Sequence, residues 1–138
     1  MTFLLSRQSK DWDRLINDGF NLCDFYCKDI EFILSNSSYI VWSKDISDKN
    51  IMSLLYKFKQ RSVFMGHGVT SEIYDDGFYF INTINNAAKY ICCTSKQESN
   101  VINTYSKMGI KTILTGMPRH DTLKNKFDVI YSNPDKYK

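Results

Sequence analysis

Short apolar segments alternate with helix-like segments along this chain, and this alternation strongly limits the folds that it can adopt. The apolar segments are rich in β-branched and aromatic residues and have the length of buried strands. Strands that alternate with helices predict a parallel sheet with helices packed on it. We therefore expect an α/β, Rossmann-like fold, with strands at 3–5, 39–42, 62–65, 90–93 and 110–115.

Helices are predicted between these strands. The stripe Ile51, Leu54, Leu55 and Phe58 has helical spacing, and its last turns carry Lys57, Lys59 and Arg61. We expect this helix to pack on the sheet, with contact to a membrane surface as the alternative. Ser95 and Glu98 form a capping box ahead of a second helical stripe, which ends at Gly109. The segment 11–32 holds no clear period, and helix is favoured there over strand.

Length and charge point to one domain without an extended basic face. With 138 residues and 43% hydrophobic content, the chain can bury one core, which we place in residues 1–124, followed by a polar linker or tail at 125–138. The balance of 18 basic against 15 acidic residues is too even to indicate a nucleic-acid partner.

The start has no signal-peptide pattern, and no apolar run reaches the roughly 20 residues of a membrane span. We expect a cytoplasmic protein, either free or peripheral on the inner face of the cell membrane.

The four cysteines, at 23, 27, 92 and 93, do not follow a zinc or disulfide spacing. Cys92 and Cys93 are adjacent on a predicted strand, so their side chains should point to opposite faces. We interpret all four as reduced thiols, largely buried, and expect no metal site.

Two loops that directly follow predicted strands hold the candidate site residues. His67 stands between Gly66 and Gly68, which let the backbone turn sharply, and an imidazole suits a general base near neutral pH. The alternative is a loop histidine that only bonds a neighbour. Arg119 follows Pro118 in a stiff loop and could bind a phosphate, or else pair with Asp121 to hold the loop. Parallel strands would bring both loops to one crevice.

Several common motifs are missing from the sequence. It has no G-x-x-x-x-G-K-[ST] loop, no G-x-G-x-x-G after a strand, no C-x-x-C pair and no H-E-x-x-H. P-loop nucleotide binding, dinucleotide oxidoreduction, zinc fingers and zincins therefore lose their usual support. We expect no cofactor.

Three co-linear segments, 63–70, 93–99 and 114–123, resemble motifs of the CDP-glycerol:poly(glycerophosphate) glycerophosphotransferases of teichoic acid and capsule synthesis. The opening segment 5–9 is similar to the start of that family's transferase region, so the resemblance covers about residues 3–124. It implies the acceptor-side, N-terminal half of a two-domain GT-B transferase, acting on a CDP-glycerol-type donor and a polyol-phosphate polymer. By resemblance, His67 is the catalytic base, and the substrate-binding residues are Gly66, Gly68, Thr70, Arg119 and Asp121.

The resemblance does not extend to a donor-binding domain, whose residues have no counterparts here. We expect either an excised piece or a shortened product that needs a partner chain, inactive alone. Two alternatives remain: a non-catalytic remnant or binding module that retains the acceptor pocket, and a sugar-nucleotide glycosyltransferase domain of GT-B fold.

Overall fold

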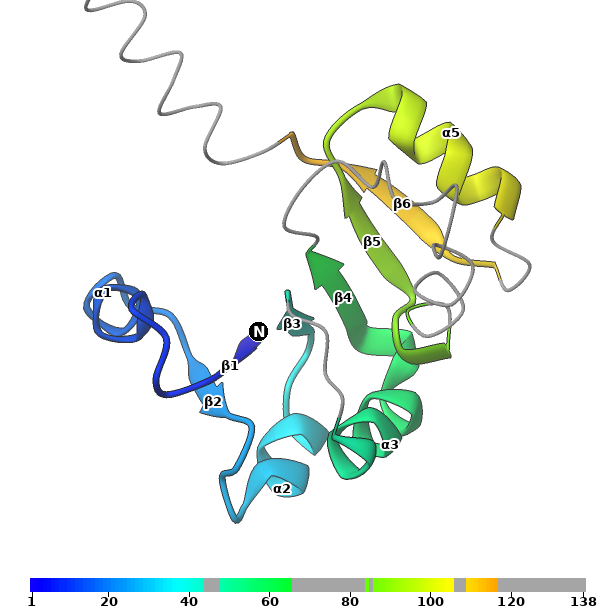
Figure 1. Ribbon diagram of the computed structural model, residues 1–138. Coiled ribbons are helices and arrows are strands. Elements are labelled where there is room, and N and C mark those ends of the chain that lie inside the picture. Colours follow the sequence, from blue (N-terminus) through cyan, green and yellow to red (C-terminus); the bar gives the residue numbers. More distant parts are fainter. Residues whose placement is uncertain (44–47, 66–83, 85, 106–108, 117–138) are drawn as a thin grey trace, which may run out of the picture.

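The computed structural model describes residues 1–43, 48–65, 84, 86–105 and 109–116 (Figure 1). Six strands form one sheet: β1 Thr2–Leu5, β2 Leu22–Asp24, β3 Ile40–Trp42, β4 Ser62–Met65, β5 Tyr90–Cys93 and β6 Lys111–Leu114. The helices are α1 Trp12–Asn17, α2 Ile30–Ser35, α3 Lys49–Lys57 and α5 Lys96–Tyr105, with the short 3-10 helix η1 Lys59–Arg61 before β4. This alternation follows the sequence pattern, in which each apolar strand is followed by a polar turn.

All strands are parallel, and their order across the sheet is β2-β1-β3-β4-β5-β6. The chain leaves β1 toward β2 on one side and then crosses back to β3 on the other side. The gap between β1 and β3 is therefore the topological switch point, beside which ligands bind in open α/β sheets. The expected α/β, Rossmann-like parallel sheet with flanking helices is confirmed.

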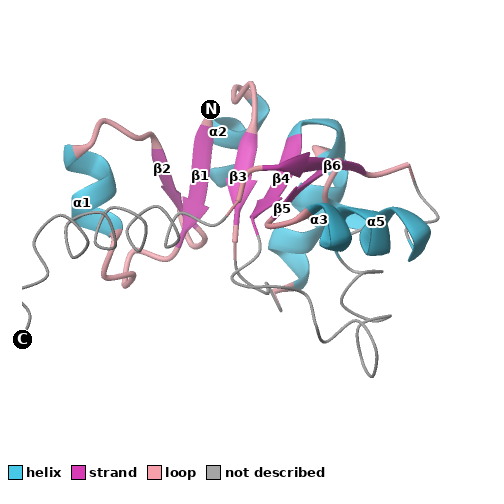
Figure 2. Cartoon of the chain, turned by 90° about the horizontal axis from the view of Figure 1, so that it is seen from above, coloured by secondary structure: helices cyan, strands magenta, loops and turns pink. Residues whose placement is uncertain are grey.

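One hydrophobic core lies between the sheet and its helices. Leu4, Trp42, Phe64 and Ile91 occupy neighbouring register positions on one face of four adjacent strands, and all are buried. Helices α2, α3 and α5 cover this face with Leu34, Ile51, Met52, Leu55 and Ile102, which belong to the same cluster. Figure 2 shows the sheet from above, with α2 behind the strands. Helix α1 buries none of its residues and lies beside β2 at one end of the sheet.

The interpretation of 11–32 as helix is only partly right. Two short helices, α1 and α2, lie in this segment, but β2 runs between them and pairs with β1. Only Cys23 of the three residues in β2 is buried, because this strand lies at the edge of the sheet. A three-residue strand with one buried side chain leaves too short a pattern to detect.

Helix α3 packs on the sheet, as the sequence predicts. Ile51, Met52 and Leu55 are buried, and Leu54 and Phe58 pack against the core. Its apolar face is therefore already covered, which removes the alternative in which this face inserts into a membrane. Asp48 caps the helix by accepting hydrogen bonds from the backbone N–H groups of Asn50 (2.8 Å) and Ile51 (3.2 Å). None of the described helices is long and apolar enough to cross a bilayer.

Candidate functional site

An open pocket of about 610 Å³ lies at the carboxyl ends of β1 and β2, next to the switch point. Its lining comes from two chain segments: Ser6, Arg7 and Gln8 follow β1, while Asp24 ends β2 and Phe25 and Tyr26 follow it. The two loops are neighbours because Leu5 of β1 pairs with Asp24 of β2 in the sheet register. The pocket therefore combines a cation, a carboxylate, polar groups and two aromatic rings.

Local hydrogen bonds fix both loops. The Ser6 hydroxyl accepts from the backbone N–H of Gln8 (3.3 Å), and the Ser6 carbonyl accepts from the N–H of Ser9 (2.9 Å). On the other side, a carboxylate oxygen of Asp24 accepts from the N–H of Tyr26 (3.3 Å), and its carbonyl accepts from the N–H of Cys27 (3.1 Å). Turns of this kind hold short loops without a strained backbone.

Arg7 is the cation of the pocket. Its side chain is exposed, and within the described ranges it makes no salt bridge, whereas Arg14 on the nearby helix α1 pairs with Asp11 at 2.9 Å. A guanidinium that pairs with no described carboxylate, set in a polar recess, can donate two parallel hydrogen bonds to the oxygens of a phosphate. Arg7 is therefore the described residue best suited to bind an anionic ligand.

Tyr26 and Phe25 form the less polar wall of the pocket. Tyr26 is 79% exposed and Phe25 is half-buried against the core. A large exposed aromatic ring at a pocket mouth offers an apolar surface for the carbon skeleton of a ligand. Together with Asp24, whose carboxylate can accept from hydroxyl groups, this wall suits a polyol better than a purely apolar molecule.

The carboxyl end of β5 is closed by the protein's own groups. Glu98, which is only 7% exposed, accepts hydrogen bonds from the backbone N–H (2.6 Å) and the hydroxyl (2.7 Å) of Thr94. The Ser95 hydroxyl accepts from the N–H of Glu98 (3.2 Å), so the capping role predicted for Ser95 is confirmed, whereas the carboxylate of Glu98 bonds Thr94 rather than the N–H of Ser95 that a full capping box would use. A buried carboxylate already lies at the start of α5, and this disfavours a second anion there.

The four cysteines are free thiols, two of them on β5 and the other two in or just after β2. Cys93 faces the core and is fully buried, while Cys92 is half-buried on the opposite face, as the sequence predicts. Burial raises the pKa of Cys93 to about 12, with smaller contributions from Glu98 and Cys92, and burial raises that of Cys23 to about 11. Among the described residues, no cluster of His, Cys, Asp and Glu could hold a metal ion.

The residues predicted from the two strand-end motifs lie outside the described part of the chain. They are Gly66, His67, Gly68, Thr70, Arg119 and Asp121. The structure does describe the strands that lead to these residues. Strand β4 ends at Met65, directly before Gly66, and β6 ends at Leu114. Both strands run parallel in one sheet, so their carboxyl ends lie on the same edge as the pocket.

Sequence reasoning missed Arg7, Asp24 and Tyr26 as site residues. The signal for Arg7 was present, because Ser6-Arg7-Gln8 follows the first predicted strand just as the two selected loops follow theirs. Asp24 and Tyr26 could not be found in this way, since β2 itself was missed.

A scan of the chain against protein-family models finds no match, and a search among curated proteins also finds none.

Proposed function

We propose that this chain is the acceptor-side part of a glycerophosphotransferase-type enzyme, which moves glycerol phosphate or a related polyol phosphate from a CDP-linked donor to a polymer. The observation that carries the proposal is the pocket beside the switch point, where Arg7 and Asp24 lie in the same open recess. The motif resemblance names the reaction, and the pocket supplies matching ligand chemistry.

The pocket chemistry fits a polyol-phosphate chain in particular. Such a polymer alternates a phosphodiester, which suits the guanidinium of Arg7, with hydroxyl-bearing carbons, which suit the carboxylate of Asp24 and the ring of Tyr26. A neutral sugar acceptor would make no ionic contact with Arg7, so the pocket suits an acceptor that contains phosphate.

His67 is the proposed base in this reaction. It would take the proton of the acceptor's terminal hydroxyl as the oxygen attacks the β-phosphorus of the donor, so that a new P–O bond forms and CMP leaves. Neighbouring strands lie about 4.8 Å apart, and β4 is two strands from β1, so the ends of these strands are roughly 10 Å apart. An extended acceptor chain held at Arg7 could span that distance.

Titration calorimetry with a short oligo(glycerol phosphate) tests the pocket. Arg7→Ala should weaken binding at least tenfold, because the charge-assisted contact is lost. The matched control is Arg14→Ala, which removes the same charge from an arginine already paired with Asp11 and should change affinity less than twofold. Equal losses in both variants would show that the effect is general electrostatics and would contradict the assignment.

Two further measurements test the enzyme assignment. In a complete enzyme that carries this segment, His67→Ala should lower turnover about a hundredfold while thermal stability stays unchanged. This chain alone should show no saturable binding of CDP-glycerol below the millimolar range, because a nucleotide site needs several fixed donors around the diphosphate. Normal turnover of the His67 variant, with unchanged thermal stability, would contradict its role as the base and would leave it a loop histidine that only bonds a neighbour.

A further inference from the structure

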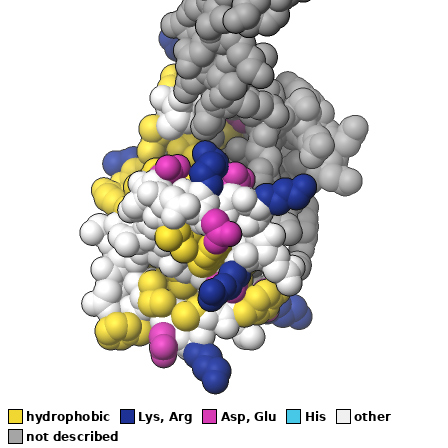
Figure 3. Space-filling view, turned by 90° about the vertical axis from the view of Figure 1, so that its left-hand side faces the viewer, with side chains coloured by type: hydrophobic (Ala, Val, Ile, Leu, Met, Phe, Trp, Pro, Cys, Tyr) yellow, Lys and Arg dark blue, Asp and Glu magenta, His cyan; other side chains and the backbone are white. Residues whose placement is uncertain are grey.

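Two of the four free thiols, Cys23 and Cys27, flank the segment that forms one wall of the pocket. Cys23 belongs to β2 and is 2% exposed, whereas Cys27 is half-buried and packs against the hydrophobic core that contains Cys23. Between them stand Asp24, Phe25 and Tyr26, which line the pocket. Figure 3 shows this end of the molecule, where apolar, basic and acidic side chains are interspersed. The two thiols therefore mark the ends of the pocket wall.

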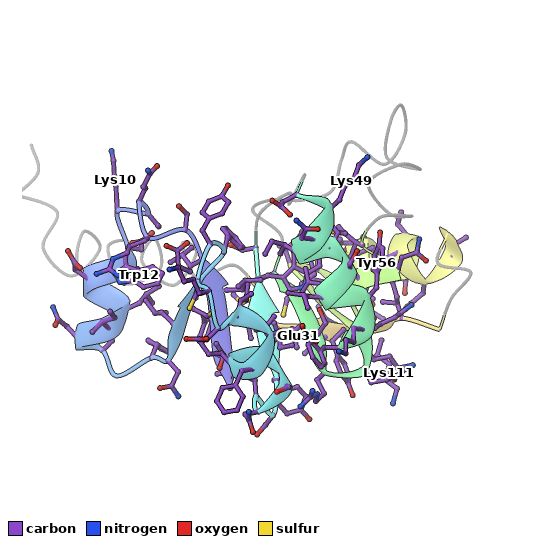
Figure 4. All side chains as sticks on the ribbon, turned by 90° about the horizontal axis from the view of Figure 1, so that it is seen from below. Lys10, Trp12, Glu31, Lys49, Tyr56 and Lys111 are labelled. Atoms are coloured by element: carbon purple, nitrogen blue, oxygen red, sulfur yellow. The ribbon has the colours of Figure 1, made fainter. Side chains whose placement is uncertain are left out.

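A tight turn brings the ends of this wall together. The backbone N–H of Cys27 donates to the carbonyl of Asp24 (3.1 Å), the residue directly after Cys23. The thiol of Cys23 also donates to that carbonyl (3.6 Å), so both cysteines bond to one oxygen atom. A turn of this kind holds its first and last Cα atoms within about 7 Å. Figure 4 shows α2, marked by the label of Glu31, beside the strands from which the turn leads.

The two thiols also interact directly. Burial raises the pKa of Cys23 to about 11, with further contributions from the charges of Cys27 and Asp24 and from a hydrogen bond with the Cys27 side chain. A hydrogen bond between two thiols places their sulfur atoms in contact. The S–S bond of a disulfide is about 2.05 Å long, so a short movement of the two side chains is enough to form it.

The other two thiols provide a contrast within the same chain. Cys92 and Cys93 are also a half-buried and a buried cysteine, and they are even closer in the sequence. Both belong to β5, where consecutive side chains point to opposite faces of the sheet. Their sulfur atoms therefore cannot join while the strand stays intact.

We propose that Cys23 and Cys27 are a redox modification site, at which a small-molecule disulfide such as glutathione disulfide forms a reversible disulfide that locks the pocket wall. This site goes beyond the proposed function, because its chemistry does not depend on which ligand the pocket binds. Where a compartment keeps thiols reduced, disulfides are usually transient and serve catalysis or redox sensing.

The reaction is a thiol-disulfide exchange in two steps. The thiol of Cys27, which is the more accessible, gives its proton to solvent, and its thiolate attacks one sulfur of the oxidant. The S–S bond of the oxidant breaks, and one glutathione leaves as a thiolate. The thiolate of Cys23, whose proton also goes to solvent, then attacks the Cys27 sulfur, and the second glutathione leaves. Two cysteine thiols are oxidised to one disulfide, and one glutathione disulfide is reduced to two thiols.

The disulfide closes a ring that contains the whole pocket wall. The hydrogen bonds from the N–H groups of Tyr26 and Cys27 to Asp24 can stay in place, because the turn already holds the ends of the ring together. The bond that is lost is the weak one from the Cys23 thiol to the Asp24 carbonyl. A cross-link removes the open forms of a segment rather than its closed form, so the oxidised wall should open less often.

Mass spectrometry of the native chain tests whether the bond forms. Trypsin separates the two pairs of cysteines, because it produces peptide 15–28 with one pair and peptide 90–96 with the other. After incubation with glutathione disulfide, denaturation and alkylation, peptide 15–28 should be lighter than its reduced form by two hydrogen atoms and carry no alkyl group. Peptide 90–96 should carry an alkyl group on both cysteines. Dithiothreitol should restore alkylation of peptide 15–28.

Two variants separate the pair from general oxidation of thiols. Cys27→Ser should leave Cys23 unmodified by glutathione disulfide, since Cys23 is nearly inaccessible to solvent. The matched control is Cys92→Ser, which removes another half-buried thiol and should leave the oxidation of peptide 15–28 unchanged. A glutathione adduct that stays on Cys27, two free thiols in peptide 15–28, or equal oxidation of peptide 90–96 would overturn the proposal.

Hydrogen exchange measures the effect on the pocket wall. The amide hydrogens of Tyr26 and Cys27, both bonded to Asp24, should exchange about tenfold more slowly in the oxidised chain. The amide hydrogen of Lys89, which bonds the Ser62 carbonyl elsewhere in the sheet, should exchange at the same rate in both forms. Unchanged or faster exchange at positions 26 and 27, with the disulfide formed, would show that the bond does not lock the wall.

Discussion

Ser62→Ala probes the buried hydrogen bond that joins β3 and β4 inside the core. The Ser62 hydroxyl accepts from the indole N–H of Trp42 at 2.8 Å, and the exposed fractions of the two residues are 0% and 2%. Trp42 also makes an edge-on contact with Phe64, with ring centroids 4.7 Å apart, so the indole cannot easily turn toward solvent. The substitution therefore leaves a buried donor without an acceptor.

The expected cost follows from that orphaned donor. A buried polar group left unsatisfied costs about 1–3 kcal/mol, and the small void left by the hydroxyl oxygen adds a few tenths. We expect a loss of about 2 kcal/mol in the free energy of unfolding. For a chain of this length that corresponds to a melting temperature lower by roughly 6–10 °C.

Urea unfolding followed by tryptophan fluorescence measures this loss, and a double-mutant cycle isolates its cause. In the Trp42→Phe background, where the donor is gone, Ser62→Ala should cost less than about 0.5 kcal/mol. Ser53→Ala is the control, because its hydroxyl bonds the Lys49 carbonyl on the exposed face of α3 and its loss should be nearly neutral. The same cost in both Trp42 backgrounds would refute the reasoning.

Three further predictions concern the core, a helix cap and the buried thiols. Leu34→Ala, at a fully buried position, should cost about 2–5 kcal/mol in chemical denaturation. Asp48→Ala should cost about 1 kcal/mol, because two N–H groups of α3 lose their acceptor, whereas Asp48→Asn should cost less. Above pH 9 the thiols of Cys23 and Cys93 ionise more readily in the unfolded chain, since folding raises their pKa to about 11 and 12. The free energy of unfolding should then fall by up to about 1.4 kcal/mol per pH unit for each thiol. Cys93→Ala should make this pH dependence less steep in melts recorded at several pH values. An unchanged slope would contradict the contribution of the Cys93 thiol.

The strands could be predicted from the sequence where they form a run of β-branched and apolar residues. This holds for β3, whose three residues are all buried, and also for β6, which lies at the edge and is mostly exposed. Leu22–Asp24 shows the opposite case, because three residues with one buried side chain leave no period to detect. Strand order could not be predicted at all, since it depends on the pairing of β1 with both β2 and β3 rather than on any local pattern.

The candidate site could also be predicted only in part. Loops that follow strands can be recognised from the sequence, and this rule selected the segments around His67 and Arg119. The pocket at Arg7 depends on the pairing of Leu5 with Asp24, which are 19 positions apart. Such pairing appears only once the chain is folded, because the sequence does not reveal which loops become neighbours.

The basic residues at the amino-terminal edge of the sheet show why an even distribution of charge along a sequence can mislead. Lys59, Lys89 and Lys111 are separated by 30 and 22 positions, so no short window of the sequence contains all three. Lys59 begins the 3-10 helix that leads into β4, Lys89 directly precedes β5 and Lys111 begins β6, and parallel strands all begin at the same edge of the sheet. The repeat of the fold therefore turns a sparse linear spacing into a local concentration of charge, while the loops after the strands gather at the opposite edge. Residues at the two edges of a parallel sheet are therefore separated by the length of the strands, and a substitution at one edge need not disturb the pocket at the other.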